Sequence, residues 1–82
     1  MKSNKELLVE LCEQNTITKL ARQLDIRYHK ETLIPRYLKE KDKKIREQKV
    51  QSADNEIKQL EILVKDLNDI IKFNKEMIDK EK

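Results

Sequence analysis

The sequence predicts an all-α protein, in which a small three-helix head precedes a long helix that forms an oligomeric coiled coil. Glycine is absent from the 82 residues and proline occurs once, at Pro35, so the tight turns of β-hairpins lack suitable residues. From Val50 to Ile78, core-type residues alternate at intervals of three and four, which is typical of a coiled coil. Charged residues make up 43% of the chain and aromatic residues 4%. A monomer therefore has little material for a core, and self-association is expected.

The N-terminal third predicts two short helices. Ser3 or Asn4 can cap the first, which should end near residue 14 or 15, and Asn15 or Thr16 can cap the second. Each helix has one apolar face. The apolar positions of the first helix are Leu7, Leu8, Leu11 and Cys12, and those of the second are Ile17, Leu20, Ala21 and Leu24.

Pro35 predicts a break or a helix start, because it disfavours helical geometry at Ile34 and removes one backbone donor. Thr32 can cap a helix that has Pro35 in its first turn. From Leu33 onward no glycine or proline interrupts the chain, so we expect one helix of about 45 residues and about 65 Å. The expected domains are a head at 1–35, a basic connecting helix at 36–49 and a coiled-coil helix at 50–82.

The heptads leave the number and direction of the paired helices open. Their a positions are β-branched and Leu60 and Leu67 occupy d, which favours a parallel dimer. A third apolar row at Leu63, Ile70 and Met77 suits an antiparallel pair, a higher oligomer or a second partner. Asn74 at a d position can fix the register. The predicted oligomer interface consists of Val50, Ile57, Leu60, Leu63, Val64, Leu67, Ile70, Ile71, Asn74 and Ile78.

The positive charge lies in the middle of the chain. Residues 17–50 contain eleven Lys or Arg and five acidic residues, a net charge of +6, against −1 before and −2 after this segment. A localised excess of this kind is typical of a surface that meets phosphates. The alternative is a solvated helix with pairs four residues apart, such as Lys43 and Glu47.

The segment KELLVELCEQNTITKLARQLDIRYHKETLIPRYLKEK resembles the helix-turn-helix domain of phage, plasmid and insertion-element proteins. A head of this kind followed by a heptad coil is similar to the small accessory subunits of insertion-element transposases. The chain departs from the pattern at Asp25, where the family usually has glycine, and in a turn about two residues longer. The matching core positions are Ile17, Leu20, Ala21, Leu24 and Ile26, followed by Leu33 and Tyr37.

This resemblance implies an oligomeric DNA-binding regulatory or accessory protein, such as a repressor, packaging or transposition factor, whose coil pairs the heads. The alternatives are a non-enzymatic helical adaptor or inhibitor that binds a larger protein partner through its apolar helix faces, and an RNA-associated factor without base readout. The residues expected to contact DNA are Arg27, Tyr28, His29, Lys30, Thr32, Arg36, Lys39, Lys43 and Lys44.

Enzymatic chemistry is not expected. Cys12 and His29 are single residues of their type, so no disulfide, zinc site or other metal site is expected. The sequence has no glycine-rich phosphate loop, and its carboxylates are spread along helices, so we expect no cofactor. No apolar run approaches the roughly 18 to 20 residues of a membrane span. The expected location is intracellular, cytoplasmic or nucleoid-associated, or nuclear in a eukaryote.

Overall fold

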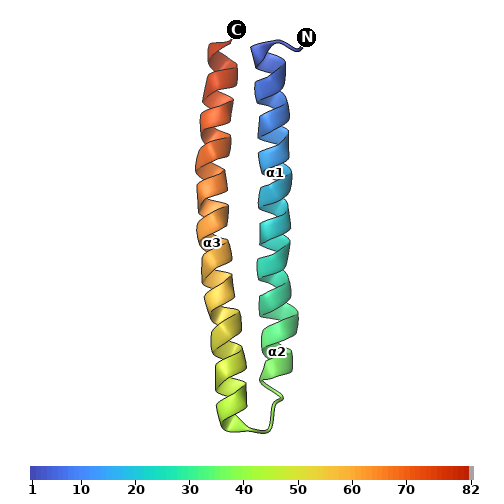
Figure 1. Cartoon of the computed structure of the whole chain (residues 1–82), viewed down its shortest axis with the longest axis vertical. Helices are drawn as coiled ribbons and strands as arrows, with labels where there is room; N and C mark the ends of the chain where they lie inside the picture. The colour runs from blue at the N-terminus through green and yellow to red at the C-terminus, as the bar shows by residue number, and fades with distance from the viewer. Residues whose placement is uncertain (82) are drawn as a thin grey trace.

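The computed structural model describes residues 1–81 and shows an antiparallel helical hairpin about 60 Å long and 17 Å wide. Its elements are α1 (Asn4–Tyr28), a π-helical turn η1 (His29–Leu33), α2 (Ile34–Tyr37) and α3 (Lys43–Lys80). The N-terminus and the end of α3 lie side by side, and the chain reverses at the opposite end (Figure 1). The all-α prediction is confirmed.

The first arm of the hairpin is helical without a break from residue 4 to residue 37. The predicted cap at Ser3 is confirmed, because its Oγ accepts a hydrogen bond from the Glu6 N–H at 3.2 Å. The predicted helix boundary at residues 14 to 16 was wrong, and the three-helix head is not seen. The hydroxyls of Thr16 and Thr18 donate to the carbonyl oxygens of Cys12 and Gln14 at 2.8 and 3.0 Å. Both hydroxyls donate to carbonyl oxygens one turn earlier in the same helix, so Thr16 lies inside α1 and does not cap a second helix.

The first arm also continues through Pro35, where a break or a helix start was predicted. In the π-helical turn before it, the Ile34 N–H donates to the carbonyl oxygen of His29, five residues back. This wider turn gives the proline ring room that a regular α-helical turn would deny it. Thr32 therefore lies within the arm and makes no side-chain cap.

The chain reverses between Leu38 and Asp42, so the predicted single helix from residue 33 was also wrong. Asp42 begins α3: its Oδ1 accepts from the N–H groups of Lys44 and Ile45 at 3.0 and 3.2 Å. An aspartate in this position satisfies donors that a helix start leaves unpaired. The segment LKEKD contains residues with high helix propensity. The packing of the two arms that the reversal allows outweighs this local preference for a helix.

That packing is the burial of the heptad face of α3 against the first arm of the same chain. The buried residues are Ala53, Ile57, Leu60, Ile71 and Asn74, and the rest of the face, Val50, Val64, Leu67 and Ile78, is half-buried. The half-buried residues opposite them include Leu8, Cys12, Asn15, Lys19, Ile26, His29 and Leu33. The periodic face was thus recognised correctly, but its cover is intramolecular.

Asn74 is the buried polar residue of this interface. It is 3% exposed, and its Nδ2 has no hydrogen-bond partner within residues 1–81. An unpaired buried amide costs about 1 to 3 kcal/mol. Asn74 therefore lowers the stability of the hairpin at this position.

Replacing Asn74 with leucine should raise the free energy of unfolding by about 1 to 2 kcal/mol, because it removes the unpaired amide. Urea unfolding followed by circular dichroism measures the change. Asn68 is exposed on the same helix, so Asn68→Leu is the matched control and should change the free energy of unfolding by less than about 0.5 kcal/mol. A destabilised Asn74→Leu variant would contradict the account.

Replacing Asp42 with alanine should lower the free energy of unfolding by about 1 kcal/mol, because two N–H groups at the start of α3 lose their acceptor. Asp42→Asn keeps a side-chain oxygen there and is the control, with a smaller effect expected. Thermal unfolding of the two variants makes the comparison. Equal losses for both would show that the cap does not stabilise the turn.

Candidate interaction surfaces

A stripe of three large aliphatic residues lies on α1 outside the half-buried positions that pack on α3, and we call it the outer stripe. It consists of Ile17, Leu20 and Leu24, which are 65%, 56% and 55% exposed. At its N-terminal end Ile17 borders a groove that Lys75 and Ile78 of α3 also line. The half-buried positions of α1, including Leu8 and Ile26, lie on the opposite side of the helix at its period of 3.6 residues. More than half of each outer-stripe side chain is therefore left exposed by the hairpin.

The inner side of α1 is not entirely apolar. Asn15 and Lys19 are half-buried toward α3, where an isolated amphipathic helix would place aliphatic residues. The exposed leucines of α1 lie on two different sides of the helix. Leu7 and Leu11 line a groove with Met77 of α3, whereas Leu20 and Leu24 belong to the outer stripe.

A second apolar surface follows α3 beside its buried heptad face, and we call it the second row. It consists of Leu63, Ile70 and Met77, at intervals of seven residues. Leu63 and Ile70 are 43% and 45% exposed, so they are the members of the predicted oligomer interface that α1 leaves exposed. Because Met77 shares a groove with Leu7 and Leu11, the open end of the hairpin presents apolar residues from both arms.

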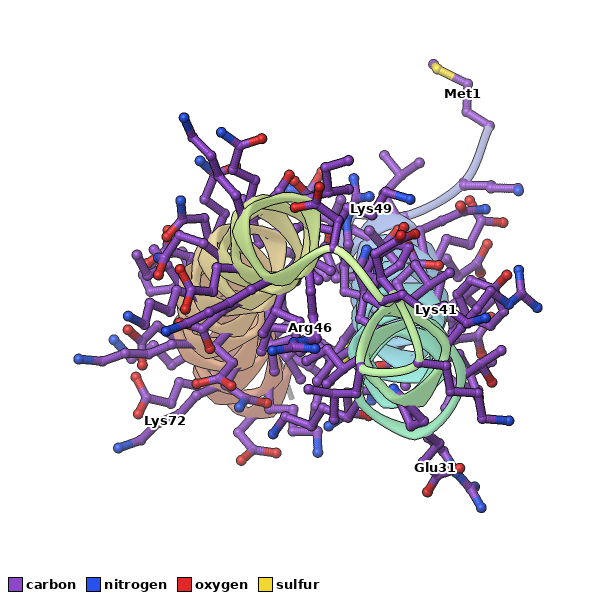
Figure 2. The ribbon with its side chains drawn as sticks, turned by 90° about the horizontal axis from the view of Figure 1, so that it is seen from below. Met1, Glu31, Lys41, Arg46, Lys49 and Lys72 are labelled. Atoms are coloured by element: carbon purple, nitrogen blue, oxygen red, sulfur yellow. The ribbon has the colours of Figure 1, made fainter. Side chains whose placement is uncertain are left out.

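The closed end of the hairpin is basic, and we call residues 36–49 the basic tip. The basic tip contains seven Lys or Arg residues and three acidic residues, so its net charge is +4. Arg46 lies between the two arms (Figure 2), where its Nη1 donates to the carbonyl oxygen of Glu40 at 3.1 Å. Lys49 Nζ is 3.6 Å from the Glu40 carboxylate and 5.9 Å from the centre of the Tyr37 ring. Arg46 and Lys49 thus hold the turn together.

The other basic side chains of the tip extend into solvent. They are Arg36, Lys39, Lys41, Lys43 and Lys44, all of them exposed. Four of these five belong to the predicted DNA-contacting set, and the chain reversal brings these four together at one end of the molecule.

The remaining predicted DNA contacts lie on the end of the first arm. Arg27 Nε pairs with Glu31 at 3.1 Å, and Lys30 Nζ lies 3.6 Å from Glu61 of α3. The Nδ1 atom of His29 is 2.7 Å from the carbonyl oxygen of Asp25. Thr32 and His29 are half-buried and Tyr28 is exposed. These residues follow one continuous helix, so the structure does not set them on a separate recognition helix.

Sequence reasoning missed the outward direction of the outer stripe and the turn that forms the basic tip. Apolar residues lie on more than one side of α1, so the sequence did not determine which side packs against α3. Asp42 was the available signal for the turn, as an N-cap residue before KKIREQ.

Within the described part of the chain, no group of three or more His, Cys, Asp or Glu side chains is placed to hold a metal ion. No helix among residues 1–81 combines the length and apolar character needed to cross a membrane. Comparisons with protein-family models, with curated proteins and with solved structures found no match to this chain.

Proposed function

We propose that this chain is a non-enzymatic helical interaction protein, an adaptor or inhibitor that binds a larger protein partner through the outer stripe of α1. The observation that carries the proposal is the exposure of Ile17, Leu20 and Leu24 by more than half on one side of a helix. Single exposed aliphatic residues are common on protein surfaces, whereas a contiguous stripe is typical of an interaction site.

The spacing of the outer stripe fits one recognised mode of binding. Ile17, Leu20 and Leu24 stand at positions i, i+3 and i+7, the anchor spacing of an amphipathic helix that binds an apolar groove. Complete burial of one such side chain contributes about 1.5 to 3 kcal/mol. Since slightly more than half of each is still exposed, the three together can contribute about 3 to 5 kcal/mol to binding.

The polar residues on the inner side of α1 support the same proposal. Asn15 and Lys19 are half-buried toward α3, whereas the outer stripe is exposed. This arrangement is unfavourable for an isolated hairpin, because polar groups are partly removed from water while apolar ones are left in it. A protein partner that covers the outer stripe would offset this cost. The arrangement is therefore what we expect of a hairpin that functions within a larger helical assembly.

Replacing Leu20 and Leu24 with glutamate should abolish capture of the partner, because two charges would be buried in an apolar contact. The measurement is affinity capture from cells of the source organism, followed by mass spectrometry. Leu38 is comparably exposed but lies at the turn, so Leu38→Glu is the control and should capture the same proteins as the wild type. Circular dichroism checks that both variants remain helical. Identical captured proteins for both variants would contradict the proposal.

A second candidate function is nucleic-acid binding through the basic tip, as an oligomeric regulatory or accessory protein. The observation that favours it is the gathering of Arg36, Lys39, Lys43 and Lys44 at one end of the molecule, where all four are exposed. Exposed basic side chains of this kind neutralise phosphates and release counterions, without reading the base sequence. The binding expected from the tip is therefore weakly specific and strongly dependent on salt.

Replacing Lys39, Lys43 and Lys44 with glutamine should weaken binding to a random-sequence DNA duplex by at least about tenfold at low salt, and should reduce the salt dependence of binding. Fluorescence titration at two salt concentrations measures both effects. Three exposed lysines of α3 away from the tip, Lys65, Lys72 and Lys80, provide a control with the same change in net charge. If the wild type does not bind DNA at low salt, this second candidate fails.

A further inference from the structure

We infer that the second row of α3, together with Leu7 and Leu11 of α1, is the interface at which a second copy of this chain packs antiparallel to the first. The result is a four-helix bundle made of two hairpins. The inference does not depend on the proposed function, because the outer stripe lies on the far side of α1 and stays exposed in such a pair.

The second row is suited to contact with itself. Leu63, Ile70 and Met77 are seven residues apart, or two helical turns, so they lie along one side of α3. The row is symmetric about Ile70. A two-fold axis through Ile70 places each Leu63 against the Met77 of the other copy and the two Ile70 side chains against each other. This is the self-complementary contact that a symmetric dimer requires, and it favours a second copy over an unrelated helix.

The charge distribution selects the antiparallel orientation. Each basic tip has a net charge of +4, and a parallel pair would hold two tips side by side. With the axis at Ile70, the nearest residue of each tip, Lys49, is 21 residues from the axis. At a rise of 1.5 Å per residue the two tips are then about 60 Å apart. That distance is several times the Debye length of about 8 Å at physiological ionic strength, so the repulsion is screened.

The size of the surface agrees with a specific but modest dimer. One helical turn beyond Leu63 and Met77 at each end gives an overlap about 30 Å long. Across a hairpin 17 Å wide, this overlap covers about 500 Å² on each copy, or about 1,000 Å² in total, close to the lower limit for specific interfaces. The groove beside Leu7 and Leu11 adds apolar contact at both ends. We therefore expect a dimer that dissociates on dilution.

Sedimentation equilibrium of the full chain over a wide range of concentrations tests the inference. The expected mass at high concentration is twice the 9.9 kDa of one chain. Ile70→Glu should give the mass of one chain with helical content unchanged, because it places two like charges at the two-fold axis. Ile62 is also exposed on α3 but lies outside the second row, so Ile62→Glu is the matched control and should remain dimeric. Should Ile70→Glu lose helicity, Ile70→Ser makes the same test without a charge.

Cysteine crosslinking tests the orientation in a Cys12→Ser background. Ile70→Cys should form a disulfide-linked dimer under mild oxidation, because the two copies meet at this residue. Leu63→Cys should not, because its counterpart is 14 residues away along the helix, or about 20 Å. Efficient crosslinking through Leu63→Cys would overturn the antiparallel orientation. A wild type with the mass of one chain at all concentrations would overturn the dimer. Neither result bears on capture by the outer stripe, which is measured separately.

Discussion

The packing of the heptad face of α3 against α1 is the interaction on which the rest of the structure depends. A helix of 38 residues with a long apolar heptad face draws most of its stability from packing that covers this face. The chain supplies the cover itself by reversing at residues 38–42. This reversal places the two ends of the chain together and gathers the basic residues at the tip. It also determines which sides of the two arms remain in solvent, so each candidate surface is a consequence of the same contact.

The sequence allowed the all-α class, the cap at Ser3 and the buried positions of α3 to be predicted, because these depend on local or periodic patterns. It did not reveal what covers α3, since a heptad pattern is the same for a second chain and for another segment of the same chain. The boundary predicted near Thr16 does not form, and the Thr16 hydroxyl bonds to the carbonyl oxygen of Cys12 within the continuous α1. Among the candidate surfaces, the exposed part of the second row, Leu63 and Ile70, was included in the predicted interface. The exposure of Ile17, Leu20 and Leu24 was not predicted. Because α1 has apolar residues on several sides, only the packing against α3 determines which of them are buried.

The three surfaces point in different directions and differ in chemistry. The outer stripe is a narrow line of aliphatic side chains on α1. The second row is an apolar row on α3 that meets Leu7 and Leu11 of α1 at the open end. The tip is a cluster of solvated cations. A pair of hairpins joined through the second row would keep two outer stripes and two tips exposed. Binding to a protein partner, self-association and binding to phosphates are therefore compatible in one molecule. Because the surfaces do not share residues, their contributions can be separated by substitution.

The π-helical turn at His29–Leu33 has a consequence for how the two arms face each other. A π-helical turn holds one residue more than the α-helical turn it replaces, and one residue rotates a helix by about 100°. The turn thus determines how α1 is rotated about its own axis relative to the closed end of the hairpin. With one residue fewer, the side of α1 marked by Leu7, Leu11 and Thr18 would take the place now held by the half-buried Leu8, Cys12 and Lys19. A single inserted residue near Pro35 can thus decide which face of the first arm is hidden and which is available to other molecules.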